Sequence, residues 1–168
     1  MKTARPITNP FTSKEPDIYQ CFGCSPHNPI GLKLEFAIEG DEVVGRWMPQ
    51  KQYEGYVDVV HGGIQATLLD EIASWYVYAI IGSAGVTKKM EVEYHHPAAT
   101  TEPFLELRAS LHSKTDKEAL LNTRLYNASG KLCTTALIAY AVFPETVARR
   151  KFFYPGKEAF IEKNSTQL

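Results

Sequence analysis

The chain lacks the excess charge, the long apolar run and the paired cysteines that would place it in several common protein classes. Its 168 residues carry 18 Lys and Arg against 19 Asp and Glu, and a net charge of −1 provides no electrostatic basis for binding nucleic acid or an anionic membrane. No apolar run reaches the ~20 residues needed to cross a bilayer, and the first residues contain no apolar core of a secretory signal. Three cysteines, an odd number, disfavour a disulfide scaffold and favour a reducing compartment. We therefore expect a cytoplasmic protein.

Two of the three cysteines, Cys21 and Cys24, form a CxxC motif. Such a motif can be half of a zinc site or a redox pair. The second half of a zinc site is missing, because Cys133 stands alone and His95–His96 is the one other close pair. The motif also does not open the helix of a βαβ unit, as it does in thioredoxin-like proteins. We therefore favour two thiols packed in a turn, with no metal and no cofactor.

The length suits a single domain that can bury a sizeable core, and a hydrophobic content of 44% is ordinary for a globular protein. The Pro- and Thr-rich residues 1–20 are interpreted as an arm lying over the domain. The domain itself is expected over residues 21–144. Residues 145–168 form an extension of mixed composition, in which 156–163 can form one short helix.

The stretch HGGIQATLLDEIASWYVYAII, residues 61–81, predicts a long central helix, because no Gly or Pro follows its two glycines until Gly82. At about 100° per residue, its polar side chains fall within one sector roughly 100° wide. These residues are Thr67, Asp70, Glu71, Ser74 and Tyr78. Nearly all the rest of the helix is apolar, with Gln65 opposite the polar sector, so we expect the helix to be enclosed, with one polar stripe that carries two carboxylates.

The remaining segments alternate as strands do. Before the helix, Leu32, Leu34, Phe36 and Ile38 share one face, and a Gly40–Asp41 turn leads to a returning strand over 43–47. After the helix, four strand-like runs cover 87–95, 104–112, 118–126 and 132–143. The last run is apolar on both faces, which is typical of a central strand covered on both sides. Short connections imply antiparallel neighbours, so the predicted fold is α+β, of order ββαββββ, with one antiparallel sheet curled around one helix.

Four sequence motifs together resemble those of the hotdog-fold acyl-CoA thioesterases. They are CFGCSPHNPIGLKLEF from Cys21, YEG at 53–55, HGGIQATLLDE from His61 and VEYHHPA at 92–98. The resemblance covers about residues 20–144 and is to the HGG-type branch with the PaaI-like and 4-hydroxybenzoyl-CoA enzymes. It implies the hotdog fold, hydrolysis of a small or medium acyl or aryl thioester, and a homodimer or dimer of dimers. Coenzyme A would enter as part of the substrate.

The chemistry of thioester hydrolysis fits the start of the predicted helix. The attacked carbonyl develops negative charge, and free N–H groups at a helix N-terminus can stabilise it. Gly62 and Gly63 allow close backbone approach. The resemblance implies that the Gly62 N–H is the oxyanion donor and that Asp70 is the base or nucleophile. These residues are ~12 Å apart along one helix, too far to act on one carbonyl, so an antiparallel two-fold dimer would have to combine them.

The resemblance extends to further positions. It implies that Ser74 orients the attacking water and that His61 contacts the thioester while holding the loop; Ser74 can equally bond to the backbone of the preceding turn. The expected substrate-binding residues are Gly63, Glu54, Gly55, Thr87, Glu71 and His96. Glu71 is expected to face a rim or a strand.

Where relatives carry Arg or Lys to bind a CoA phosphate, this chain has His95–His96. Other cations can take that place, namely Lys88, Lys89, Arg108, Arg124 or the 149–151 cluster. Two other functions remain open: a non-enzymatic acyl-thioester binder or sensor, and a hotdog dehydratase or hydratase.

Overall fold

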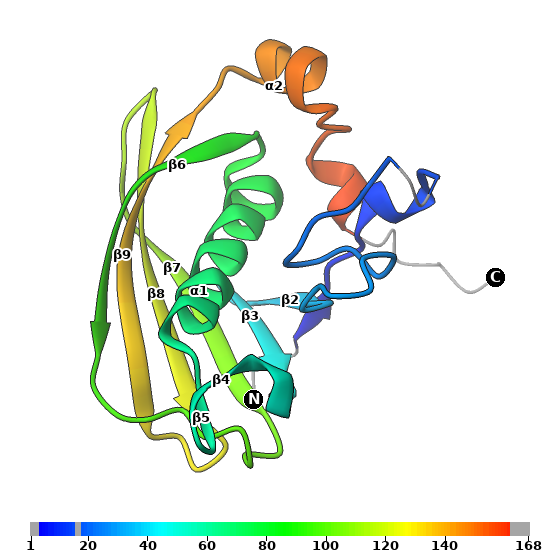
Figure 1. The fold of residues 1–168 in the computed structure, drawn as a ribbon. Coiled ribbons are helices and arrows are strands. Elements are labelled where there is room, and N and C mark those ends of the chain that lie inside the picture. Colours follow the sequence, from blue (N-terminus) through cyan, green and yellow to red (C-terminus); the bar gives the residue numbers. More distant parts are fainter. Residues whose placement is uncertain (1–3, 16–17, 162–168) are drawn as a thin grey trace, which may run out of the picture.

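The computed structural model describes residues 4–15 and 18–161 and shows one antiparallel sheet curled around a long helix (Figure 1). The strands follow the order β1-β2-β3-β7-β8-β9-β6, and every neighbouring pair is antiparallel. Their bounds are β1 Arg5–Pro6, β2 Phe36–Glu39, β3 Glu42–Trp47, β6 Gly85–Tyr94, β7 Leu105–Lys114, β8 Glu118–Asn127 and β9 Leu132–Val142. A separate small hairpin pairs β4 (Glu54–Tyr56) with β5 (Val59–Val60) just before the helix. The predicted α+β fold and its order ββαββββ are confirmed.

The central helix α1 spans Gly62–Tyr76 and continues through the π-helical turn η3 (Val77–Ile81). Gly82 ends it in a left-handed conformation, with φ 83°, which glycine adopts without steric cost. Its apolar side chains are enclosed as predicted: the buried residues include Leu68, Leu69, Ile72, Ala73, Trp75, Tyr76 and Val77. No helix among residues 4–15 and 18–161 is long and apolar enough to cross a membrane.

Two details of the predicted sheet are wrong. Leu32 and Leu34 are buried, as the alternation indicated, but the strand begins only at Phe36. Residues 32–35 before it have no regular structure and are held in part by the Trp47 indole, whose Nε1 donates to the Leu32 carbonyl at 3.2 Å. The last strand, β9, is not central, because it is second from the edge of the sheet. It lies between β8 and the edge strand β6, and Leu137 on its outer face stays half-buried.

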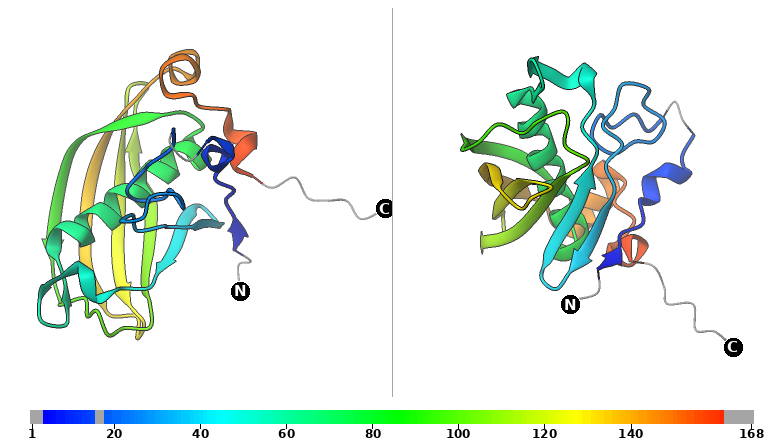
Figure 2. Two further views of the ribbon diagram at one scale, coloured as in Figure 1. Left: turned by 45° about the vertical axis from the view of Figure 1, so that its right-hand side comes forward. Right: turned by 90° about the horizontal axis from the view of Figure 1, so that it is seen from below.

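The two ends of the chain pack onto the side of α1 that the sheet leaves open (Figures 1 and 2). Near the N-terminus, β1 pairs with β2, and the 3-10 turn η1 (Pro10–Ser13) buries Phe11. The short helix predicted over 156–163 is present in part, as the 3-10 turn η4 (Lys157–Phe160), and residues 162–163 lie outside the described part. The helix before it, α2 (Glu145–Phe152), was not predicted.

Phe160 of η4 is fully buried. Its ring lies within 6 Å, centroid to centroid, of Phe11, Trp75, Tyr78 and Tyr154. The arm and the extension therefore contribute to the same core as the sheet. A further 3-10 turn, η2 (Lys51–Tyr53), leads from β3 into the β4–β5 hairpin.

Candidate functional site

A cavity of about 540 Å³ opens beside the first turn of α1. Four of the residues predicted to act on or bind the substrate line its wall. These are Gly55 of β4, His61 and Gly62 at the helix start, and His96 after β6. The cavity is formed between the β4–β5 hairpin and the end of β6, so segments far apart in sequence converge on the helix N-terminus.

His61 is the N-cap of the helix. Its ring Nδ1 accepts a hydrogen bond from the Gly63 N–H at 2.9 Å, and its own N–H donates to the Tyr53 carbonyl at 2.8 Å. The Gly62 N–H has no partner among the described residues, because the first N–H groups of a helix have no acceptor within it. The His61 ring therefore caps the helix, and its backbone is the part that bonds to the preceding loop. The Gly63 N–H is bonded to the cap. Gly62 lines the cavity, and its own N–H has no partner among the described residues.

Tyr94, at the end of β6, was not among the predicted site residues. Its hydroxyl donates to the Gly62 carbonyl at 2.8 Å, and the side chain is 54% exposed. A Cβ atom added at Gly62 would lie 3.2 Å from this hydroxyl. Sequence alternation placed Tyr94 on a strand face but could not show that this face meets the helix start.

Asp70 lies two turns further along α1, at the other end of β6. Its Oδ1 accepts from Thr87 of β6 at 2.8 Å. The hydroxyl of Tyr140 on β9 lies 2.7 Å from the same oxygen and 2.8 Å from the Asp70 carbonyl. No described residue donates to the second carboxylate oxygen, Oδ2, so one oxygen is held and the other is available.

Tyr140 is the partner of Asp70 that sequence reasoning missed. It is 2% exposed, and burial together with the charge of Asp70 raises its pKa, so the hydroxyl stays protonated and acts as a donor. A signal existed, because a buried tyrosine hydroxyl needs a polar partner. The apolar run on both faces of this strand concealed it.

Gly62 and Asp70 do not meet within one chain. Eight residues of helix separate them by ~12 Å, and Asp70 is absent from the wall of the cavity that contains Gly62. Their strand neighbours are Tyr94 and Thr87, near opposite ends of β6. β6 is the last strand of the sheet, and its outer edge has no partner strand within the described chain.

Glu71 and Ser74 face a different part of the molecule from Asp70. Both line a second cavity, of about 570 Å³, together with Cys21 and Cys24. The expectation that Glu71 faces a rim or a strand is therefore wrong. Ser74 donates to the Glu71 carbonyl at 2.9 Å, the backbone bond of the preceding turn, which is the alternative to orienting water beside Asp70.

The second cavity contains a cluster of acidic groups. Cys21 Sγ lies 3.5 Å from Glu71 Oε1, and Cys24 Sγ lies 3.2 Å from Cys21 Sγ. The hydrogen bond from Cys24 lowers the pKa of the Cys21 thiol to about 5 and raises that of Cys24 itself. Burial raises the pKa of Glu71 to about 7. The CxxC residues do pack in a turn, as expected, but the turn closes over a carboxylate of α1.

Two other predicted binding residues, Glu54 and His96, already bond to groups of the protein. Glu54 accepts from the Asp58 N–H at 2.8 Å and forms an ion pair with Lys51, so it organises the loop. His96 Nδ1 lies 2.9 Å from the Leu132 carbonyl and must donate to it. That bond uses the one N–H of a neutral imidazole, so it leaves His96 no ring donor for a phosphate.

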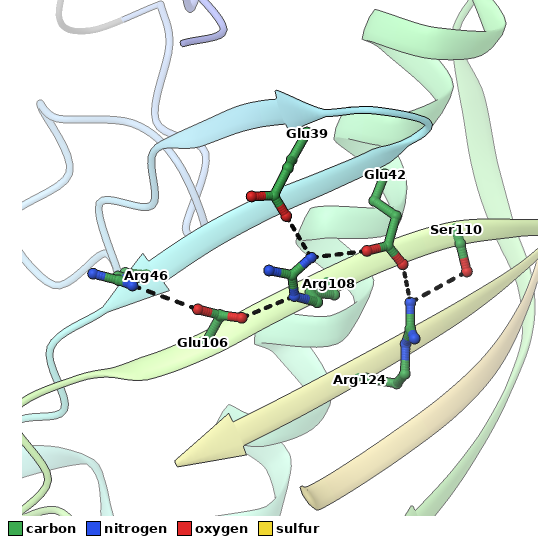
Figure 3. Close-up of polar contacts among 7 residues, drawn as sticks. All are labelled: Glu39, Glu42, Arg46, Glu106, Arg108, Ser110 and Arg124. Atoms are coloured by element: carbon green, nitrogen blue, oxygen red, sulfur yellow. Dashed lines mark hydrogen bonds and ion pairs between the residues drawn. The ribbon is translucent and has the colours of Figure 1, made fainter. Parts of the chain in front are cut away.

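Most of the cations suggested as phosphate contacts are already paired with carboxylates. Figure 3 shows Arg108 bridging Glu39 of β2 and Glu42 of β3, at 2.7 and 2.9 Å. Arg124 of β8 also pairs with Glu42 on this outer face of the sheet. Four further pairs occupy Lys88 with Glu118, Lys89 with Glu91, Arg108 with Glu106 and Arg149 with Glu145. These groups line neither of the two cavities.

Comparison with known proteins connects this geometry to one family. A model of the thioesterase superfamily matches residues 58–134, which include the helix and most of the following strands. A crystallised protein described as a thioesterase superfamily protein is 26% identical, with TM-score 0.66, and the match covers 74% of this chain but only 60% of that one. The comparison with curated proteins finds no match.

Two further solved structures share the fold. A hypothetical thioesterase from Streptococcus pneumoniae, crystallised with coenzyme A, is 20% identical, with TM-score 0.59, over 62% of this chain and 83% of its own. The PaaI protein of the Escherichia coli phenylacetic acid degradation operon is 15% identical, with TM-score 0.61, over 68% of this chain and 82% of its own. At these identities the likeness supports a common architecture.

Proposed function

Because a model of the thioesterase superfamily matches residues 58–134, we propose that the chain is an acyl-CoA thioesterase that hydrolyses a small or medium acyl or aryl thioester. The products are the free acid and coenzyme A. Coenzyme A in the S. pneumoniae structure, and acetyl-CoA bound to a Streptococcus mutans protein that is 17% identical, support coenzyme A as the thiol carrier. A cytoplasmic location, where acyl-CoA is available, completes this proposal.

In this mechanism two subunits share each site. The Gly62 N–H of one subunit donates to the thioester oxygen as negative charge develops there. Asp70 of the other subunit takes a proton from the attacking water, or attacks the carbonyl itself. The carbon–sulfur bond then breaks, and the thiolate of coenzyme A leaves and is protonated. Thr87 and Tyr140 hold one Asp70 oxygen, which leaves Oδ2 to face the reaction.

The edge strand β6 supports this two-fold assembly. It is ten residues long, and most of it is exposed, including Val86 at 42% and Tyr94 at 54%. A long unpaired edge is a template for pairing with another strand. If two β6 strands pair antiparallel about a dyad between Met90 and Glu91, Thr87 of one subunit lies opposite Tyr94 of the other. The Asp70 of one subunit is then brought toward the Gly62 of its partner, in two equal sites. Two such dimers can associate further into a tetramer.

One observation carries the proposal: a helix N-terminal donor and a half-held carboxylate, each without a further partner among the described residues, lie beside opposite ends of the same edge strand. A mere binder or sensor has no need of a carboxylate whose second oxygen is left without a donor. A dehydratase or hydratase of this fold would pair its acid with a catalytic His, and neither His61 nor His96 bonds to Asp70 among the described contacts.

The test is Asp70→Asn, assayed against a panel of acyl-CoAs with a thiol reagent. We expect hydrolysis to be abolished while the dimer persists in size-exclusion chromatography. Asp116→Asn, in the exposed β7–β8 turn, is the matched control and should keep wild-type turnover. Retained turnover in Asp70→Asn would remove Asp70 from the mechanism. Binding of acyl-CoA by the wild type without thiol release would identify a sensor, and loss of enoyl absorbance would identify a hydratase.

The shared site is tested by mixing two inactive variants. Asp70→Asn and Gly62→Pro each inactivate both sites of their own dimer. A mixed dimer has one site with both defects and one site with neither. Random exchange of equal amounts makes half of the dimers mixed, so about one quarter of wild-type activity should return. If no activity returns after subunit exchange is verified, the two residues do not act across the dimer.

A further inference from the structure

The CxxC turn and helix α1 bring three potential metal ligands to one point. Cys21 Sγ lies 3.5 and 3.7 Å from the two Glu71 oxygens and 3.2 Å from Cys24 Sγ. One ligand atom from each residue lies within 4.8 Å of the other two. All three residues line the cavity of about 570 Å³, on the side of α1 turned away from Asp70. The thioesterase chemistry proposed above uses none of them.

Each of the three groups is also held by a second contact. The Cys24 N–H donates to Cys21 Sγ at 3.4 Å, the Trp75 indole donates to Glu71 Oε1 at 3.0 Å, and the Tyr19 hydroxyl lies 2.8 Å from Cys24 Sγ. Outer contacts of this kind orient the ligands of protein metal sites. The turn fits tightly over the carboxylate. A Cβ at position 23 would lie 2.4 Å from Glu71 Cδ, so only the glycine that stands there allows this approach.

No described side chain brings a positive charge to this cluster. Two thiols and a carboxyl share one enclosure, and deprotonation of any one of them disfavours deprotonation of the others. No described Lys, Arg or His forms an ion pair with Glu71. Lys14 lines the same cavity, but its ammonium group sits over the Phe153 ring, 4.3 Å from the centroid. A divalent cation would neutralise most of the negative charge of these three groups once they have lost their protons, and no described side chain does so.

We propose that Cys21, Cys24 and Glu71 bind one thiophilic divalent cation, with zinc(II) as the best match, and that its fourth position faces the cavity. Thiolate ligands select zinc over magnesium or calcium, and CxxC is a spacing that zinc sites use. The missing half of the zinc site is therefore a carboxylate fifty residues away rather than a second Cys or His pair. Tetrahedral zinc with Zn–S distances of ~2.3 Å separates its sulfurs by ~3.8 Å, so the two thiols would move apart by about 0.6 Å on binding.

A redox pair is the competing role for two thiols at this distance. The lowered pKa of Cys21 suits an attacking thiolate, but a redox pair leaves the Glu71 carboxyl at 3.5 Å without a role. Cys24 is also only 5% exposed, which restricts access to the sulfur that would resolve a mixed disulfide. A metal site needs no such access, and it uses the carboxylate.

The experiment is titration of the reduced full-length protein with cobalt(II), followed by displacement with zinc. We expect one cobalt per chain, with a sulfur-to-cobalt charge-transfer band and the d–d absorption of tetrahedral coordination, both lost on adding zinc. Cys133→Ser is the matched control. It alters the other buried cysteine, which bonds only to backbone carbonyls, and it should leave both spectra unchanged.

Two variants locate the site. Cys21→Ser should reduce the charge-transfer band and weaken cobalt binding by roughly 100-fold or more, given that even outer-contact changes cost ~10–100-fold. Glu71→Gln keeps both sulfurs, so the band should remain while affinity falls at least ~10-fold. If a variant fails to fold, the titration of the wild type still decides. Absence of stoichiometric cobalt in a protein with titratable thiols overturns the proposal, and so does a Cys21–Cys24 disulfide that forms readily in a protein without metal affinity.

Discussion

Replacing Gly62 with proline is the sharpest available test of the oxyanion donor, because it removes one N–H group and little else. Gly62 is the first residue of α1, where proline is well tolerated, and its N–H has no partner to lose among the described residues. Proline also restricts the preceding residue to extended conformations, and His61 already has φ −54° and ψ 134°. The helix and its N-cap should therefore survive the substitution.

The control is Gly62→Ala, which adds a Cβ but keeps the N–H. That Cβ lies 3.2 Å from the Tyr94 hydroxyl, a contact tighter than usual, but Tyr94 is 54% exposed and can move. Both variants add this atom, so the ratio of their rates isolates the N–H group. Loss of one oxyanion donor lowers kcat by ~10²–10³, or about 2.7–4 kcal/mol in the transition state. We expect this ratio between alanine and proline, and a much smaller change between glycine and alanine.

The assay is steady-state release of coenzyme A on the best substrate of the panel, with circular dichroism and size-exclusion chromatography as checks on fold and assembly. A proline variant within about threefold of the alanine variant would refute the donor role, since even one weak oxyanion contact is worth more than that. Equal losses of 100-fold in both variants would instead assign the effect to displacement of Tyr94. Only a selective loss in the proline variant fits the proposed chemistry.

Two further substitutions test how the site and the core are held. Tyr140→Phe removes the buried hydroxyl that holds Asp70, so we expect about 1.5–3 kcal/mol less stability in urea unfolding and a lower kcat with little change in KM; unchanged stability and kcat would show that Thr87 alone positions the carboxylate. Phe160→Ala empties a fully buried site in the C-terminal extension, so it should cost about 3–5 kcal/mol of unfolding free energy. A loss below 1 kcal/mol would show that the extension is not part of the core.

The central helix and the order of the strands could be predicted because both follow from the spacing of apolar residues along the chain. Residues 61–81 have one polar sector and no interior Gly or Pro, and α1 with η3 occupies Gly62 to Ile81. Local alternation does not report hydrogen bonding. The alternation therefore placed Leu32 and Leu34 on a strand, although their N–H groups donate to the Phe22 and Gly23 carbonyls rather than to a neighbouring strand. Two short helical segments lie on either side of Gly156 in the extension, and only the second of them was predicted.

The site was predicted in part, and the limit is again physical. Spacing along a helix shows that Gly62 and Asp70 cannot share a carbonyl, and the structure places them near opposite ends of β6. What spacing cannot show is which groups lie opposite each side chain. Tyr140 reaches Asp70 from a strand seventy residues later. Glu71 meets a turn fifty residues earlier, so the CxxC motif seemed to have no partner.

The adjacent acids Asp70 and Glu71 allow the two proposals to fail separately. They differ by ~100° around α1, and the helix directs Asp70 to β6 and β9 and Glu71 to the CxxC turn. Asp70→Asn should therefore remove turnover and leave cobalt binding unchanged, because no atom of the cobalt site bonds to Asp70 among the described contacts. If Asp70→Asn impaired both, the two cavities would be coupled through the helix. If the wild type bound no cobalt while turnover still depended on Asp70, the cluster would be a pair of thiols packed against a carboxyl, and the thioesterase proposal would stand.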